Sequence, residues 1–151
     1  MFNGKIDQLA YIAYNDEDER KIKIALGLQD AEWIEDIVLA AGTVRGVEGE
    51  NTAKLLFNYD MGVEVEILRY TEGPNYASNL VGGRLCHVGI HADAGVPAPT
   101  FDAPIIQQVL TQTHTNAYLL GNGRKYRYTI YDTFAALGVY TKVIERIERA
   151  S

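Results

Sequence analysis

The sequence predicts an α+β protein in which two tandem βαβββ modules form a curved mixed sheet around a cupped pocket. The chain has 151 residues, 47% of them hydrophobic, which is enough for the core of one compact domain. Extended segments alternate with helical ones, and the same order of elements runs through both halves. We place the first module at residues 1–73, a linker rich in Gly, Asn and Pro at residues 74–83, and the second module at residues 84–151.

The first module begins with IDQLAYIAY at residues 6–14, a run of β-branched and aromatic residues that predicts a buried strand. Asn15 can then cap a helix, and the acidic residues after it suit the positive end of the helix dipole. Gly27 is expected to end this helix. Three further strands should complete the module, at residues 33–41, 52–59 and 63–70.

The pattern restarts with LCHVGIHAD at residues 85–93, which predicts a strand of the same character as the first. Asp102 can cap a second helix. The apolar residues of that helix are paired at four-residue spacing, Ile105 with Val109 and Ile106 with Leu110. Three strands should complete this module, at residues 117–120, 124–132 and 139–147.

The composition excludes several classes of partner. A net charge of -6 argues against a nucleic-acid surface, which needs clustered Lys and Arg. No apolar run approaches the roughly 18 residues that span a bilayer, and the N-terminus lacks the basic start and apolar stretch of a signal peptide. A single cysteine, Cys86, excludes an intrachain disulfide. We therefore expect a cytoplasmic protein with no nucleic-acid partner and no membrane partner.

Short motifs at the module ends point to a known layout. Each half opens on a strand close to Ile-Asp-His-apolar-small, here IDQLA and LCHVG, and the first half closes on GVEVE from Gly62. Together with the order of elements, these motifs resemble the vicinal-oxygen-chelate superfamily. That superfamily includes glyoxalase I, methylmalonyl-CoA epimerase, extradiol dioxygenases and metal-free bleomycin-binding proteins. The resemblance covers roughly residues 5–147 and implies the paired-module fold.

The resemblance also implies a set of site residues. In metal-dependent members, four ligands lie on the first and last strands of the two halves. The matching positions here are Gln8, Glu66 and His87, with Lys142 where those enzymes usually have Glu. Glu145 lies three residues further on and would need a shifted register to reach the same face, because side chains alternate along a strand.

A glyoxalase-like lyase or isomerase is the function that these residues imply. Gln, Glu and His side chains can hold nickel, zinc, manganese or iron(II). The metal would polarise a substrate carbonyl, while Glu66, or a nearby carboxylate such as Glu145, moves a proton between adjacent carbons.

The alternative function is that of a metal-free protein that binds or sequesters a drug or metabolite, as in the bleomycin-resistance branch. An ion pair between Lys142 and Glu66 would leave the floor of the pocket without a metal. The 10 tyrosines of the chain fit an aromatic-lined pocket.

Further pocket residues are expected from strand parity and composition. They are His91, which shares the face of His87, and the basic and aromatic residues Tyr126, Arg127 and Tyr128. Glu64 is expected to be solvated or at an interface. In either function the ligand is a small molecule, and long edge strands in need of cover favour a homodimer.

Overall fold

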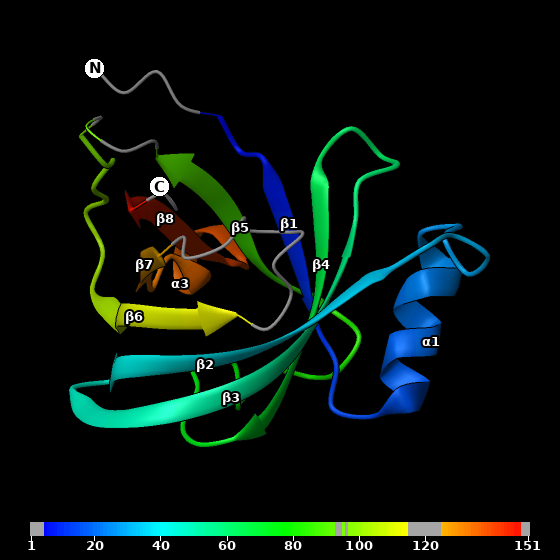
Figure 1. Cartoon of the computed structure of the whole chain (residues 1–151), viewed down its shortest axis with the longest axis horizontal. Coiled ribbons are helices and arrows are strands. Elements are labelled where there is room, and N and C mark those ends of the chain that lie inside the picture. The colour runs from blue at the N-terminus through cyan, green and yellow to red at the C-terminus, as the bar shows by residue number, and fades with distance from the viewer. Residues whose placement is uncertain (1–4, 93–94, 96, 115–124, 149–151) are drawn as a thin grey trace.

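The computed structural model describes residues 5–92, 95, 97–114 and 125–148. Within these residues, eight strands form one sheet closed into a barrel (Figure 1). The strands are β1 (Gln8–Ile12), β2 (Ile34–Val44), β3 (Val47–Asn58), β4 (Glu64–Glu72), β5 (Leu85–Ala92), β6 (Ile105–His114), β7 (Lys125–Tyr131) and β8 (Tyr140–Glu148), and the helices are α1 (Asp16–Ala25) and α3 (Phe134–Leu137). The prediction of an α+β protein with a curved mixed sheet is confirmed.

The strand pairing repeats between the two halves. β1 pairs in parallel with β4, and β5 pairs in parallel with β8. The halves meet twice, because β1 pairs antiparallel with β5 and β2 pairs antiparallel with β6. The order around the barrel is therefore β1-β4-β3-β2-β6-β7-β8-β5. As described, this sheet has no free edge, so the edge-strand argument for a dimer was wrong.

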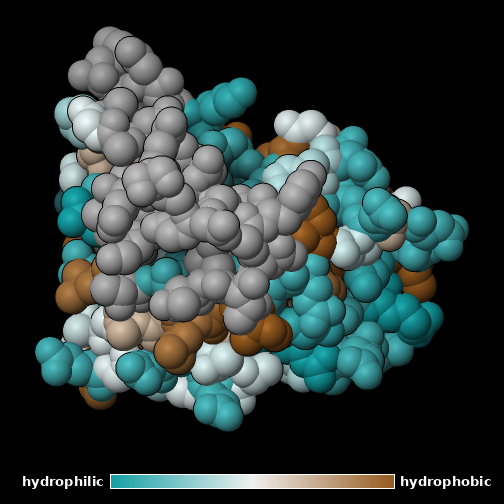
Figure 2. Space-filling view, viewed as in Figure 1, coloured by the Kyte–Doolittle hydropathy of each residue, from teal (hydrophilic) through white to brown (hydrophobic). Residues whose placement is uncertain are grey.

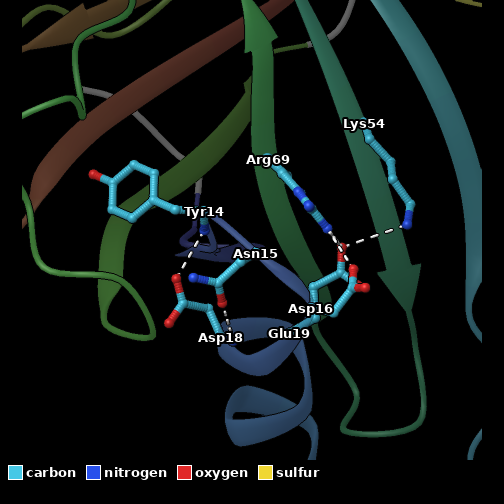
Figure 3. Close-up of polar contacts among 7 residues, drawn as sticks. All are labelled: Tyr14, Asn15, Asp16, Asp18, Glu19, Lys54 and Arg69. Atoms are coloured by element: carbon cyan, nitrogen blue, oxygen red, sulfur yellow. Dashed lines mark hydrogen bonds and ion pairs between the residues drawn. The ribbon is translucent and has the colours of Figure 1, made fainter.

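Helix α1 follows the sequence prediction. The Asn15 side chain accepts a hydrogen bond from the Asp18 backbone N–H at 2.8 Å, and Asp18 in turn accepts from the Tyr14 N–H at 2.9 Å. These contacts fix the first turn of the helix (Figure 3). Ile22 buries its side chain against Leu56 of β3 and residues near it, so α1 covers the outer face of the first half.

Charged side chains also join α1 to the sheet. Arg69 of β4 contacts Asp16 at 2.8 Å and Glu19 at 3.3 Å, and Lys54 of β3 contacts Glu19 at 3.4 Å (Figure 3). Asp16 is almost fully exposed, so its ion pair contributes little to stability. Glu19 is buried and has two cationic partners, which makes it the more specific anchor.

The second helix was predicted wrongly, because the segment from Ile105 forms strand β6. The pairing of β6 with β7 shifts register between Ile105 and Gln107, which is the mark of a β-bulge at Ile106. The bulge lets Ile106 and Val109 both face the core although they are three residues apart. Their helix-like spacing therefore arises from a bulged strand. Described residues 95 and 97–104, between β5 and β6, contain no helix.

The remaining predicted strands of the second half have different outcomes. Residues 125–131 and 140–148 are strands, as predicted, with the short helix α3 between them. The strand predicted at residues 117–120 lies outside the described residues. None of the helices in the described part of the chain is long and apolar enough to cross a membrane.

The barrel is filled from both halves and leaves some apolar side chains outside. The buried cluster includes Ile12 from β1 and Ile130 from β7, each fully enclosed. Figure 2 shows hydrophobic colour over the surface where β2 and β6 run side by side. Exposed residues on these two strands include Leu39 and Leu110.

Closure of the barrel can be tested at Gly42, where β2 approaches β6. A Cβ on Gly42 would lie 2.0 Å from the carbonyl oxygen of Gln108. We expect Gly42→Ala to lower the free energy of unfolding by roughly 1–3 kcal/mol, as for other overpacked sites. Gly49, the partner of Gly42 on β3, is the matched control, since its Cβ would meet only Pro74 at 3.7 Å. Equal urea midpoints for the two variants would contradict the pairing of β2 with β6.

Candidate functional site

A chain of hydrogen bonds runs through the barrel where β1 lies between β4 and β5. The Tyr76 hydroxyl donates to Nδ1 of His87, and Nε2–H of His87 donates to Oε1 of Gln8 at 2.8 Å. Nε2 of Gln8 then donates to Glu64 at 2.5 Å, and the Tyr59 hydroxyl donates to the other Glu64 oxygen at 2.8 Å. With the hydrogen of His87 on Nε2, each of these four bonds has one donor and one acceptor. The chain holds His87 in one orientation.

Local sequence explains how Gln8 reaches the interior. Gly89 is its antiparallel partner on β5, and a Cβ at that position would lie 2.6 Å from Oε1 of Gln8. The glycine therefore leaves the space that the amide occupies.

Burial lowers the pKa of His87 well below its usual range, and the positive charges of Lys142 and His91 act in the same direction. His87 is thus a neutral imidazole at pH 7.

Glu66 lies beside this chain without joining it. Its side chain is buried, with 2% of the residue exposed, and Oε1 lies 3.8 Å from Nε2 of His87. Among the described residues, Oε1 of Glu66 has no hydrogen-bond partner. Burial raises the pKa of Glu66, and the charge of Lys142 opposes this shift without offsetting it. Glu66 is therefore a buried carboxyl group that loses its proton at a higher pH than a solvated glutamate does.

Lys142 occupies the position in the second half that Glu66 occupies in the first. Glu66 pairs with Ala10, two residues after Gln8, and Lys142 pairs with Gly89, two residues after His87. Lys142 is buried, and its Nζ lies 4.2 Å from the centre of the Tyr128 ring. No hydrogen bond joins Lys142 to Oε1 of Glu66, which lacks a partner in the described structure.

The other candidate residues lie elsewhere. Glu145 is ion-paired with Arg127 at 3.1 Å, and the Arg127 side chain is exposed, so neither reaches the barrel interior. The His91 side chain is partly exposed and contacts Asp7 at 2.8 Å. Burial lowers the pKa of His91, but the Asp7 hydrogen bond and nearby carboxylates outweigh it, so the pKa is raised overall. The side chain of Tyr126 lies outside the described part of the structure.

A small cavity lies inside the barrel against Glu66 and Lys142. Its volume is about 20 Å³, which is room for about one water molecule or one small polar group. The polar residues around it come from five strands: Asn51, Glu66, Tyr70, Gln112, Tyr128 and Lys142. Of the predicted pocket residues, Tyr128 and Lys142 line this cavity, while Arg127 and His91 do not.

Three residues of the site were missed from the sequence. Glu64 was expected to be solvated or at an interface, but residues two apart on a strand share a face, so its position two residues before Glu66 was a usable signal. Tyr76 lies in the predicted linker and yet is fully buried against His87. Gln107, which donates to the Tyr128 hydroxyl at 3.2 Å, lies in strand β6, which was predicted to be a helix. No sequence pattern identifies these last two.

Gln8, Glu66 and His87 offer three donor atoms of the kinds that a divalent ion can bind. Oε1 of Gln8 and Oε1 of Glu66 lie 2.8 and 3.8 Å from Nε2 of His87, and a cation would give the unpartnered Glu66 oxygen a partner. To bind an ion through Nε2, His87 would have to carry its hydrogen on Nδ1. The Tyr76 hydroxyl oxygen would then accept a hydrogen bond from Nδ1–H. The described residues contain no group of three His, Cys, Asp or Glu side chains placed for a metal, and the third donor here is an amide.

No family model matches the chain, and no curated protein matches it. Solved structures to which the chain is similar include a hypothetical protein from Bacillus halodurans, with 14% identity, 99% of each chain covered and a TM-score of 0.48. A methylmalonyl-CoA epimerase has 16% identity, 95% of each chain covered and a TM-score of 0.39.

A fusion of a xylose isomerase-like TIM barrel with a 4-hydroxyphenylpyruvate dioxygenase has 15% identity and a TM-score of 0.42. It is matched over 97% of this chain and 26% of its own. At these identities and TM-scores, the likeness says nothing about the activity or the site of this chain. Methylmalonyl-CoA epimerase is one of the enzymes named above for the resemblance of the sequence motifs.

Proposed function

We propose that the protein is a glyoxalase-like isomerase or lyase that acts on a small molecule, with Glu66 as the group that moves a proton. The observation that carries this proposal is a fully buried carboxyl group with an unpartnered oxygen, next to a neutral imidazole and a cavity. A solvated carboxylate is a weak base at neutral pH. Burial raises the pKa of Glu66 towards the range in which proton transfer is effective.

Gln8, Glu66 and His87 would hold a divalent metal ion. When bound, such an ion polarises a substrate carbonyl and stabilises the negative charge that develops on it. The chain's own residues prepare the site: Tyr76 orients the His87 ring, and Glu64 orients the Gln8 amide. Glu66 then has one oxygen close to His87 and the cavity on its other side, where a substrate group can enter.

A second candidate is metal-free binding of a small ligand. It is favoured by Lys142, a buried cation where the related enzymes carry a ligand carboxylate. It is also favoured by the hydrogen-bond chain, which satisfies Gln8 and His87 without any ion. The two candidates differ in their response to metals.

Assembly and location remain predictions. We propose a homodimer, now supported by the exposed apolar side chains Leu39 and Leu110 on the outer faces of β2 and β6 instead of by sheet edges. Residence in the cytoplasm stays an expectation from the sequence.

Metal binding is tested by thermal unfolding of chelator-treated protein. We expect nickel, zinc or manganese at a hundredfold excess over the dissociation constant to stabilise the wild type by about 2.7 kcal/mol through linkage. His87→Ala should abolish this shift. Each variant is compared with itself, with and without metal, because His87→Ala also disturbs the hydrogen-bond chain.

His91→Ala is the matched control, since this histidine pairs with Asp7 outside the cavity and should not affect the metal response. If metal does not stabilise the wild type, or stabilises His87→Ala equally, the proposed metal site is refuted. Metal-free binding of a small ligand would then be the function to test.

Glu66→Gln gives a second test, by its effect on stability against pH. Because the folded pKa of Glu66 is raised, the folded state is destabilised as pH rises above the unfolded pKa, and this cost is absent at acid pH. Glu66→Gln should therefore raise the melting temperature of metal-free protein at pH 7 to 8, and the gain should vanish below about pH 4. A gain of a few degrees is expected, since 1 kcal/mol is worth roughly 2–4 °C at this length. A loss of stability at pH 8 would show that Glu66 is well solvated or paired.

A further inference from the structure

Lys142 is a buried cation that makes no ion pair with a carboxylate of the described residues. Only 8% of the residue is exposed. Within the described residues it has no ion pair at 4.0 Å or less, and its Nζ lies over the Tyr128 ring at 4.2 Å. A buried ammonium is costly unless it is paired or hydrogen-bonded. The cation–π contact with the Tyr128 ring offsets part of this cost. The ammonium can still form a hydrogen bond or an ion pair with a further partner.

The cavity is where that partner would lie. Lys142, Tyr128 and Glu66 all line this cavity, which has a volume of about 20 Å³. The Tyr128 oxygen accepts a hydrogen bond from Nε2 of Gln107 at 3.2 Å and is also hydrogen-bonded to Tyr70, which lines the same cavity. With both neighbours as donors, the hydroxyl hydrogen of Tyr128 is left for another acceptor. Burial raises the pKa of Tyr128, which keeps this hydrogen in place at neutral pH. Two residues with donor groups, one of them charged, therefore line one small space.

Two donors beside a space of this size suit one carboxylate oxygen, which can accept a hydrogen bond from both. Glu66 itself does not supply that carboxylate, because its one ion-pair contact at 4.0 Å or less among the described residues is with His87 and not with Lys142. The room for about one small group means that the rest of a ligand must lie outside this cavity.

We propose that Lys142 and Tyr128 form a carboxylate-binding subsite, so that the molecule on which Glu66 acts is a small carbonyl compound bearing a carboxylate, such as a 2-oxo acid. This inference rests on the proposed function for the role of Glu66 but not for the binding itself. Lys142 is a specificity-determining residue in this account. Lys142 stands where metal-dependent members of the superfamily usually have a ligand carboxylate. In the second half of the barrel Lys142 therefore binds the carboxylate of the substrate, while Glu66 in the first half acts as the base.

The test uses the full chain after chelator treatment, so that no metal contributes. The probe is pyruvate, with the uncharged amide pyruvamide as its isosteric control, and affinity is read from thermal stabilisation and calorimetry. Lys142→Gln alone would leave Glu66 buried without a nearby cation, so the comparison is made in the Glu66→Gln background. Glu66→Gln should bind pyruvate at least as tightly as the wild type, because a like charge is removed. Glu66→Gln with Lys142→Gln should bind it at least about tenfold more weakly.

Lys54→Gln in the same background is the matched control, because Lys54 pairs with Glu19 of α1 outside the barrel. It should leave pyruvate affinity unchanged, and pyruvamide should not distinguish the variants. The proposal is overturned if pyruvate fails to bind, if pyruvamide binds as well as pyruvate, or if loss of Lys142 has no effect. A failed metal response would refute the metal in the proposed function without touching any of these outcomes.

Discussion

The antiparallel pairing of β1 with β5 is the contact on which the interior of this protein depends. It places Gln8 opposite Gly89, and the missing Cβ of the glycine lets the amide turn inward to meet His87. The parallel neighbours β4 and β8 then bring Glu66 and Lys142 to the same interior. The pairing of β2 with β6 closes the barrel around these buried polar groups, and burial makes each of them sensitive to its partners.

Burial gives the two halves opposite chemistry at equivalent positions. Glu66 in the first half and Lys142 in the second stand at the same register relative to the β1 and β5 strands. They are close enough for the ammonium to lower the pKa of the carboxyl group, yet burial dominates and keeps that pKa raised. A buried carboxyl group and a cation thus line one small cavity, and this is the basis for proposing a ligand that has a carboxylate and a carbonyl group with an acidic C–H bond beside it.

Much of this arrangement could be predicted from the sequence, and the failures have physical causes. The helix cap at Asn15 and the equivalence of Gln8 with His87 follow from residue type and repeat. β6 was misread because a bulge at Ile106 gives a strand the apolar spacing of a helix. Tyr76 could not be placed, since its burial depends on a segment without regular structure that folds back onto β5. Local patterns do not encode such long-range contacts.

The proposed role of Glu66 depends on a carboxyl group whose pKa is raised by burial inside the barrel. Carbon-13 NMR of protein labelled at the Glu side-chain carboxyl groups measures this pKa directly, with Glu66→Gln used to assign the resonance. We expect this resonance to titrate at a higher pH than those of the exposed glutamates, because burial raises the pKa of Glu66. Titration of Glu66 at or below the usual pH for a glutamate would show a solvated or ion-paired carboxylate, and Glu66 could then not be the buried base.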